Sequence, residues 1–291
     1  MRSHGRLGNQ FFHYLVAQQA QQAGEMIVFL GFGSLNRLVR LSGKNRFRIP
    51  ISPKLDAHVK PAERWLRRLG RSGTISRIHL DSDSRSLVRT EGKLPFTIVD
   101  SGTYQDWNAF STAEIAELAS EVKKYSIKGH MYSFAEIQPQ AETAPFFFVH
   151  VRRGDYLRFP TRESPAVIPI EWYREMMHNI RTEHPGITFR VYSEDSAYVR
   201  RNLGLEPNTE VRNLGDLATF LEMAEASGGI LSPSTFSLWS AYFAHIGGAA
   251  GPFLAPNYWL GWRDEVWIQP ELKLDFLSYQ NVFPTISRKN E

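Results

Sequence analysis

Apolar positions in the first half of the chain predict two helices, short strands and a long irregular stretch. Helical spacing of apolar residues over 9–23 predicts a helix, and the apolar run 26–30 predicts a buried strand. Residues 32–95, in which Gly, Pro, Ser and Arg are scattered, are expected to be irregular. A short strand is predicted at 97–100, and Ser111 with Glu114 indicates a capping box that opens a further helix.

The second half alternates regularly between apolar runs and amphipathic stretches. Strands are predicted at 146–151, 187–192, 229–232 and 252–255, and helices at 170–181, 217–226 and 235–245, with Asp216 and Ser234 as N-caps. Strands separated by helices of this length indicate βαβ units and a parallel sheet.

A polar, proline-containing stretch near 135–145 indicates a domain boundary. We predict two domains, 1–140 and 141–291, because one domain usually holds about 100–200 residues. The predicted fold class is α/β. Two such halves facing one another would place a ligand cleft at the carboxyl ends of the strands.

The chain has 291 residues and no cysteine, which excludes disulfides, Cys-ligated metal centres and a cysteine nucleophile. Its apolar runs are much shorter than the roughly 18–20 residues of a membrane span, and the N-terminus lacks a secretory pattern. We expect a cytoplasmic protein, with membrane association or an anchor upstream of this sequence as alternatives.

The net charge of +4 is unevenly distributed. Residues 36–93 carry 15 Lys/Arg and 5 Asp/Glu, a net charge of +10, and the remainder carries −6. This basic segment could contact an anionic membrane or phosphorylated ligands, or be a solvated insertion. Its core, AERWLRRLGRSG, is typical of a short amphipathic helix on a membrane. No aromatic ladder accompanies the arginines, so a nucleic-acid partner is not expected.

Two segments carry hydroxyl, amide or glycine residues at a predicted helix start. In HGRLGNQ (4–10), Gly5 and Gly8 allow the backbone to approach a ligand closely, and the free N–H groups of the helix start favour an anion. In SPSTFS (232–237), Ser and Thr hydroxyls at a helix start could form a phosphate cradle or a plain N-cap.

A third segment, HVRRGDY (150–156), directly follows a buried strand. Two adjacent arginines at the carboxyl end of a parallel strand need anionic partners, and a guanidinium matches a phosphate bidentately. Because side chains alternate along a strand, His150 and Arg152 are expected to face the ligand and Arg153 to be paired structurally. An ordinary Arg–Asp pair at a strand end is the alternative.

In order and spacing, these segments resemble glycosyltransferase family 11, the GDP-fucose-dependent α-1,2-fucosyltransferases. The resemblance rests on GRLGNQFFHYL, GTYQDW, VHVRRGDYL, VYSED, GDLATFLEMAEASGGILSPSTFSLWSAYF and APNYW. It implies a GT-B fold, in which two Rossmann-like domains face one another across a cleft. The domain 1–140 would be on the acceptor side and the domain 141–291 would bind GDP-fucose. The implied reaction is metal-independent, inverting transfer of L-fucose from GDP-β-L-fucose to a hydroxyl of a galactose-terminated oligosaccharide.

The resemblance also implies roles for individual residues. Arg152 would hold the β-phosphate of the departing GDP, where electrostatic stabilisation is usually a large effect. The other implied contacts are His150 and Asp216 with the guanosine, Ser234 and Thr235 with the pyrophosphate, and Gly8, Asn9 and Gln10 with the fucose.

The general base is left open between Asp155 and His13, since an acceptor hydroxyl must lose its proton during transfer. Asp155 could equally be an arginine partner, and His13 a core residue of the first helix. Two positions depart from the family pattern: Pro233 stands in place of an Asn and removes a backbone donor, and Glu194 stands in place of an Asp.

Three alternatives remain. Asp81 and Asp83 form a DxD pattern that would suit a metal-dependent glycosyltransferase. The GRLGNQ segment also resembles protein O-fucosyltransferases. The basic segment 36–93 could instead make the chain a non-catalytic polyanion-binding module.

Overall fold

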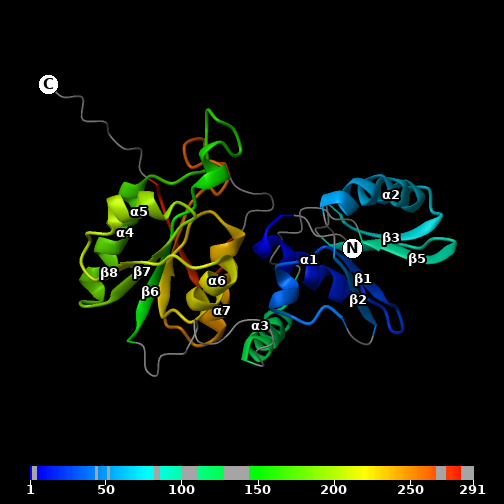
Figure 1. The fold of residues 1–291 in the computed structure, drawn as a ribbon, viewed down its shortest axis with the longest axis horizontal. Helices are drawn as coiled ribbons and strands as arrows, with labels where there is room; N and C mark the ends of the chain where they lie inside the picture. The colour runs from blue at the N-terminus through cyan, green and yellow to red at the C-terminus, as the bar shows by residue number, and fades with distance from the viewer. Residues whose placement is uncertain are drawn as a thin grey trace. The chain divides into compact units, whose positions relative to one another are not determined.

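The computed structural model describes residues 1, 5–42, 45–50, 53–81, 86–99, 110–127, 144–266 and 273–282 (Figure 1). The chain divides into an N-terminal unit, Met1–Ser133, and a C-terminal unit, Phe134–Glu291. This division falls in the same stretch as the predicted boundary at 140/141, and both lie outside the described residues.

The N-terminal unit is organised around helix α1 (Leu7–Ala20), which is buried along most of its length. Strands β1 (Ile27–Leu30) and β2 (Arg46–Ile49) form a parallel pair, with the 3-10 helix η1 (Leu35–Arg37) between them in the chain. Helix α3 (Thr112–Ile127) is joined to α1 by a hydrogen bond from Tyr14 Oη to Glu121. The predicted capping box is confirmed, because Ser111 Oγ accepts from Glu114 N at 3.2 Å.

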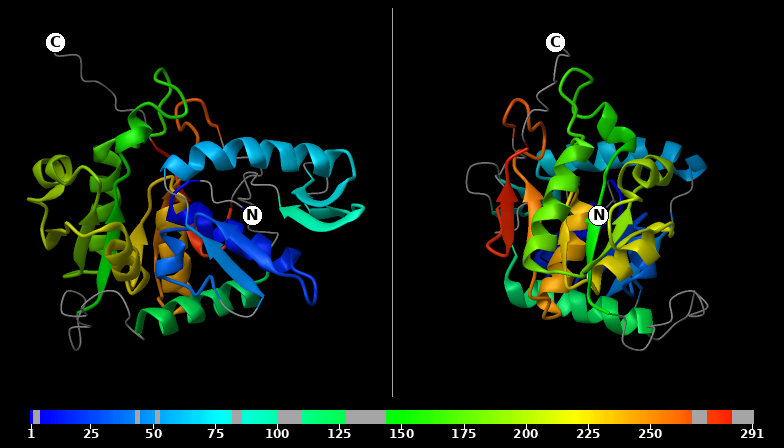
Figure 2. Two further views of the ribbon diagram at one scale, coloured as in Figure 1. Left: turned by 45° about the vertical axis from the view of Figure 1, so that its right-hand side comes forward. Right: turned by 90° about the vertical axis from the view of Figure 1, so that its left-hand side faces the viewer.

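The prediction that residues 32–95 are irregular is wrong. Besides β2, this stretch contains helix α2 (Pro53–Arg71) and strands β3 (Ile75–Leu80), β4 (Leu87–Thr90) and the start of β5 (Leu94–Val99). Strand β3 pairs antiparallel with β4 and parallel with β5, and α2 runs beside this sheet (Figure 2). The scattered Gly, Pro and Arg residues give this stretch no clear local pattern. Its helix and strands are stabilised by these long-range pairings rather than by local propensity.

The C-terminal unit is built on a six-stranded parallel sheet with the order β11-β10-β9-β6-β7-β8. The strands are β6 (Phe146–His150), β7 (Thr188–Tyr192), β8 (Thr209–Val211), β9 (Gly228–Ile230), β10 (Phe253–Pro256) and β11 (Leu277–Gln280). The helices are α4 (Ile170–Glu183), α5 (Ser196–Leu203), α6 (Asp216–Ala224) and α7 (Thr235–Ile246), with the 3-10 helix η3 (Gly154–Leu157) after β6. The predicted α/β class and parallel sheet are confirmed. The arrangement of two domains across a cleft stays a prediction.

Strand β6 is buried on both faces, as expected of the central strand in a parallel sheet. Phe147 and Val149 belong to a core shared with α4 and α5. On the other face, the His150 ring lies 5.5 Å from that of Phe236 in α7, and Phe236 contacts Phe220 of α6. The two faces of β6 are therefore covered by different helix pairs.

The order of the strands reverses next to β6. The chain continues from β6 to β7 and β8 on one side, and then crosses by way of α6 to β9 on the other. In open α/β sheets, ligands bind at the carboxyl ends of the strands at this point of reversal. Gly228 and Gly229 allow β9 to lie against β6 here, because a Cβ on either glycine would overlap the ring of Phe147 or Phe148.

Candidate active site

The residues that follow β6 and β9 meet at the point where the strand order reverses. His150 ends β6, and its Nδ1 lies 2.7 Å from the Oγ of Ser232, just after β9. Both residues are buried. Burial, together with the nearby Arg152 charge, lowers the pKa of His150 to about 3, so the imidazole is neutral at physiological pH. A neutral histidine held in one orientation can form a specific hydrogen bond with a polar group of a ligand.

Arg152 is the charged centre of the site. Its side chain is only 11% exposed. Nη2 donates to Asp155 Oδ1 at 2.5 Å and Nη1 lies 3.6 Å from Glu194 Oε1, while the guanidinium lies over the ring of Tyr156. Nε is buried and has no hydrogen-bond partner among the described residues. Because an unsatisfied buried donor on a charged group is costly, this N–H is suited to an anionic acceptor.

Arg153 has protein partners of its own, which are different from those of Arg152. Its guanidinium stacks on the ring of Tyr198 at 3.4 Å, and Nε lies 3.3 Å from Asp195 Oδ2. Asp195 in turn caps α5 by accepting from Tyr198 N. This geometry agrees with the expectation that the two neighbouring arginines have different surroundings.

Glu194, which departs from the family pattern in sequence, lies beside Arg152 in the structure. Its Oε1 accepts from Arg153 N at 3.0 Å and faces Arg152. A Cβ on Gly154 would lie 2.7 Å from the same oxygen, so the glycine leaves room for the carboxylate. Its position directly after β7, on the same sheet edge as His150, is the signal that could have identified it.

Tyr173 of α4 also reaches this edge and was not predicted. Burial raises the pKa of its hydroxyl, and the Glu194 charge raises it further. The tyrosine is therefore a neutral side chain near Ser232 and Glu194.

The predicted cradle at the start of α7 has a capped helix terminus. Ser234 is the N-cap, and its Oγ accepts from Phe236 N at 3.3 Å, as predicted. Ser237 Oγ donates to the carbonyls of Ser232 and Ser234, which fixes the turn that contains Pro233. Thr235 is the first helical residue and is partly exposed.

The prediction that Asp216 is an N-cap is wrong. Gly215 occupies that position, and Asp216 is the exposed first residue of α6. A carboxylate in the first turn still interacts favourably with the helix dipole, and this accounts for an Asp at that place.

The candidate residues in the N-terminal unit lie on α1. Gly8 and Asn9 are in its first turn, and the buried Gln10 uses its Oε1 to accept from Leu35 N at 3.0 Å. Gln10 therefore supports η1. His13 is 3% exposed, with its ring edge-on to Phe32, which is the surrounding expected of a core histidine.

Several predicted features lie outside the described residues, namely His4, Asp83 and the segment 102–107. In the part of the chain that is described, no three His, Asp or Glu side chains are grouped so as to hold a metal ion. No helix within the described ranges has the length and apolarity needed to cross a membrane.

Comparison with known proteins gives a family for one segment. Residues 120–257 match the model of glycosyl transferase family 11. Galactoside alpha-(1,2)-fucosyltransferase 1 of Saimiri sciureus is 32% identical over 111 residues, which cover 36% of this chain and 30% of the relative. Galactoside 2-alpha-L-fucosyltransferase SEC1 of Bos taurus is 28% identical over 102 residues, which cover 33% and 28%. The chain thus spans about a third or less of the length of these relatives.

Solved structures with a similar course of the chain are distant in sequence. Fucosyltransferase NodZ from Bradyrhizobium is 14% identical with a TM-score of 0.46, over 82% of this chain and 90% of that chain. The E. coli heptosyltransferase WaaC with ADP is 14% identical with a TM-score of 0.42, over 89% and 88%. The family model covers β6, the paired arginines, Glu194 and the start of α7. Residues 120–257 of this chain, a little under half of its length, are therefore similar to glycosyl transferase family 11.

Proposed function

We propose that the chain is an inverting α-1,2-fucosyltransferase that moves L-fucose from GDP-β-L-fucose to a galactoside hydroxyl of a glycan acceptor. The family match and the names of the curated relatives support this proposal. The observation that carries it is Arg152, with a buried, unpartnered Nε–H at the point where the strand order reverses.

A nucleoside diphosphate would supply the hydrogen-bond acceptor that the Nε–H of Arg152 lacks. A guanidinium keeps its charge at any working pH, and a phosphate oxygen is an acceptor of matching geometry. In the proposed reaction, the acceptor oxygen bonds to C1 of fucose while the bond from C1 to the β-phosphate oxygen breaks. The electron pair leaves with GDP, whose growing negative charge Arg152 stabilises. A well-placed donor of this kind is worth on the order of 3–4 kcal/mol in the transition state.

The remaining contacts follow the resemblance. Ser234 and Thr235 would bind the pyrophosphate, and Gly8, Asn9 and Gln10 the fucose. His150 and Asp216 would bind the guanosine, to which the neutral His150 ring offers a polar edge rather than a charge. We propose that no metal ion is needed, because Arg152 takes the position that a cation would have at the leaving group.

The proton of the acceptor hydroxyl must pass to a base or to water. Asp155 is the candidate beside Arg152, and its side chain is 56% exposed, so an acceptor can reach it. Its ion pair with Arg152 is the competing role. If Asp155 is the base, Asp155→Asn will lower kcat, whereas loss of its negative charge beside Arg152 will not weaken GDP binding. Asp155→Asn with unchanged kcat would leave the carboxylate as an arginine partner only.

The experiment for this proposal is fucosyl transfer to a β-galactoside in EDTA, with the linkage and anomeric configuration of the product determined. An α-1,2-linked product in EDTA is the expected result. Activity that requires Mn²⁺ would favour the metal-dependent alternative through Asp81 and Asp83. Transfer to a protein hydroxyl alone would favour a protein O-fucosyltransferase. No transfer, combined with salt-dependent binding to heparin, would favour the polyanion-binding module.

We also propose a cytoplasmic location with peripheral contact to an anionic membrane through α2. The exposed Trp65 is flanked on this helix by the exposed cations Arg64 and Arg68. An aromatic ring bordered by cations suits the interface of an anionic bilayer. Sedimentation with anionic but not neutral vesicles is expected, and it should be lost in Trp65→Ser. Equal sedimentation with both vesicle types would contradict the charge-based contact.

A further inference from the structure

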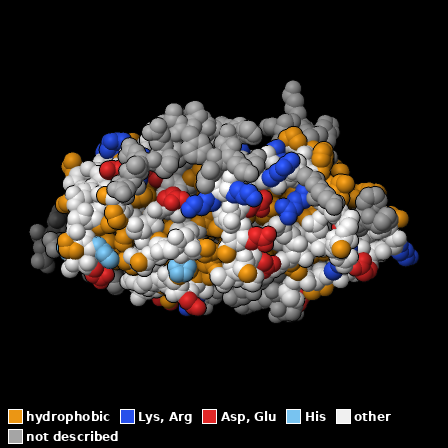
Figure 3. Space-filling view, turned by 90° about the horizontal axis from the view of Figure 1, so that it is seen from below, with side chains coloured by type: hydrophobic (Ala, Val, Ile, Leu, Met, Phe, Trp, Pro, Cys, Tyr) orange, Lys and Arg blue, Asp and Glu red, His pale blue; other side chains and the backbone are white. Residues whose placement is uncertain are grey.

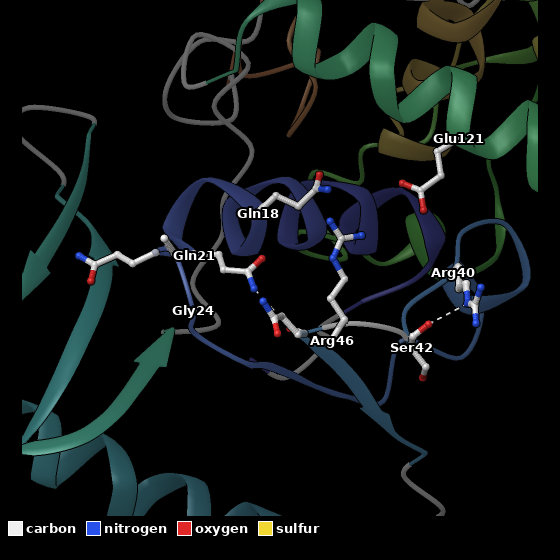
Figure 4. A pocket seen from close by; sticks show the side chains of 10 residues that line it. Gln18, Gln21, Gly24, Arg40, Ser42, Arg46 and Glu121 are labelled. Atoms are coloured by element: carbon white, nitrogen blue, oxygen red, sulfur yellow. Dashed lines mark hydrogen bonds between the residues drawn. The ribbon is translucent and has the colours of Figure 1, made fainter.

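The N-terminal unit contains a polar cavity at the carboxyl-terminal end of α1 (Figure 4). Its volume is about 610 Å³, within the range of about 300–1,000 Å³ for small-molecule sites. Side chains from α1, the turn after it, the segment before β2, the first residue of β2 and helix α3 line it. The polar lining residues are Gln18, Gln21, Gln22, Arg40, Ser42, Asn45, Arg46 and Glu121.

A buried tyrosine organises one wall of this cavity. Tyr14 Oη donates to Glu121 Oε2 at 2.9 Å and accepts from Arg46 Nη1 at 2.7 Å and from Gln18 Nε2 at 3.2 Å. Burial raises the pKa of Tyr14, and the Glu121 charge raises it further. The hydroxyl therefore stays protonated and neutral while it contacts all three side chains. Figure 4 shows Arg46 directed toward Gln18, with Glu121 reaching in from α3. Three polar side chains are thus held in place before any ligand arrives, which reduces the entropy lost on binding.

The charge of the cavity favours an anion. In the described part of the chain, neither Arg40 nor Arg46 lies within ion-pair distance of a carboxylate, whereas Arg67 and Arg89 of the same unit are paired with glutamates. Arg40 donates from Nε to Ser42 O at 2.9 Å, so its remaining N–H groups are available. Two arginines and one glutamate give the lining a net charge of +1.

The amide side chains favour a ligand rich in hydroxyl groups. Gln21 uses its Nε2 on the carbonyls of Glu25 and Asn45, which leaves its carbonyl oxygen free to accept. Gln22 is exposed, and its side chain has no hydrogen-bond partner among the residues that the structure describes. An amide offers both a donor and an acceptor, and neighbouring hydroxyls on a sugar ring need both.

We propose that this cavity binds an anionic saccharide, a sugar ring that carries a carboxylate or a phosphate. Arg40 and Arg46 take the acidic group, and Gln18, Gln22 and Glu121 take ring hydroxyls. The cavity is separate from the candidate contacts at Gly8–Gln10. Gln21 directly follows α1, and at 1.5 Å per residue it lies about 16 Å from Gln10 along the helix axis. Binding here is therefore independent of the proposed fucosyl transfer.

The test is an NMR titration of the ¹⁵N-labelled full chain with glucuronate. Glucose supplies hydroxyls without the charge, and acetate supplies the charge without the ring. Glucuronate should give saturable shifts in the side-chain amides of Gln18 and Gln22, with a lower Kd than either control compound. Arg40→Gln and Arg46→Gln should each raise that Kd about tenfold or more, equivalent to about 1.4 kcal/mol. Arg71→Gln, which removes an exposed charge from α2, should leave it unchanged.

Arg46→Gln removes a hydrogen bond to the buried Tyr14 and could disturb the fold, so Gln22→Ala is the second variant. In this proposal the Gln22 side chain contacts only the ligand. Its loss should therefore weaken glucuronate binding severalfold and leave the unfolding transition unchanged. The proposal is overturned if glucuronate produces no saturable shift, if glucose binds equally well, or if both arginine variants bind glucuronate like the wild type. None of these outcomes depends on whether GDP-fucose is a substrate.

Discussion

At the scale of single residues, the two arginines after β6 differ in what neutralises them. Arg153 has a stacked tyrosine and a carboxylate, whereas Arg152 has two carboxylates and still keeps a buried N–H without an acceptor. Alternation along the strand predicted that Arg153 is paired structurally, as it is, whereas the ligand-facing role of Arg152 stays a prediction. It could not predict Glu194 or Tyr173, because their proximity depends on the ends of other elements.

The first prediction concerns Arg152. Arg152→Ala should lower kcat/KM for fucosyl transfer by on the order of 10²–10³, because the charge that develops on GDP loses its main donor. Folding should survive, since the two carboxylates left behind, Asp155 and Glu194, both remain in contact with solvent. Steady-state kinetics with circular dichroism measures both. A variant that is folded and retains near-normal turnover would remove the phosphate role of Arg152.

The second prediction is that Arg153→Ala is a stability variant. Its loss removes a stacking contact and a partly exposed ion pair, which together should cost about 1–2 kcal/mol in the free energy of unfolding. Urea denaturation measures this cost, with Arg153→Lys as the control that keeps the charge. An unchanged unfolding midpoint for Arg153→Ala would contradict the structural assignment.

The third prediction concerns pH. His150 has a pKa of about 3 in the folded chain, against the ordinary value of 6.5 in the unfolded chain. Below pH 6.5 the unfolded state binds a proton at His150 that the folded state does not. His150 therefore lowers the free energy of unfolding as the pH falls from 6.5 toward 3, and it has no such effect above pH 7. Between pH 6.5 and 3, the free energy of unfolding of the wild type should fall by about 1.4 kcal/mol per pH unit more than that of His150→Asn. Parallel curves of unfolding free energy for the two proteins would show that His150 is not buried in its neutral form.

At the scale of elements, local patterns predicted the helices and strands that carry strong signals. The capping box at Ser111 and the buried run of β6 were identified because their information is local. Strand β8, helix α5 and strands β3 and β4 were missed, and only the second half of β5 was predicted, since short or polar elements become stable only through pairing partners far away in the chain.

The fourth prediction tests the close approach of β9 to β6. A Cβ on Gly229 would overlap the buried ring of Phe148, so Gly229→Ala should lower the free energy of unfolding by about 1–3 kcal/mol. Gly261→Ala is the matched control, because the nearest heavy atom to its added Cβ, outside its chain neighbours, is 3.5 Å away. Urea denaturation compares the two. Equal stability would show that the strands can separate without cost.

At the scale of the whole molecule, part of the excess positive charge of the segment 36–93 is neutralised by glutamates among the described residues. On the face shown in Figure 3, basic and acidic side chains lie next to one another. In the basic segment, Arg67 and Arg89 are neutralised by glutamates, and Arg40 and Arg46 line a cavity instead. The net charge could be read from the sequence, but these individual partners depend on the folded unit.

The chain divides at 133/134, and the sequence placed a boundary at 140/141 from the polar composition of the same stretch; that the two units are the predicted acceptor and donor domains stays a prediction. The cavity at the end of α1 could not be predicted. It needs side chains from α1, the segment before β2, β2 itself and α3 in one place, and no motif in the sequence links them.

The central claim is that Arg152 and its neighbours bind the diphosphate of a guanine nucleotide sugar. Calorimetric titration with GDP, UDP and CMP in EDTA tests it most directly. We expect GDP to bind in preference to the other two nucleotides, with a Kd that rises about tenfold or more in Arg152→Ala and stays unchanged in the control Arg71→Gln. UDP binding that appears only when Mn²⁺ is restored, or no nucleotide binding in either buffer, would contradict it.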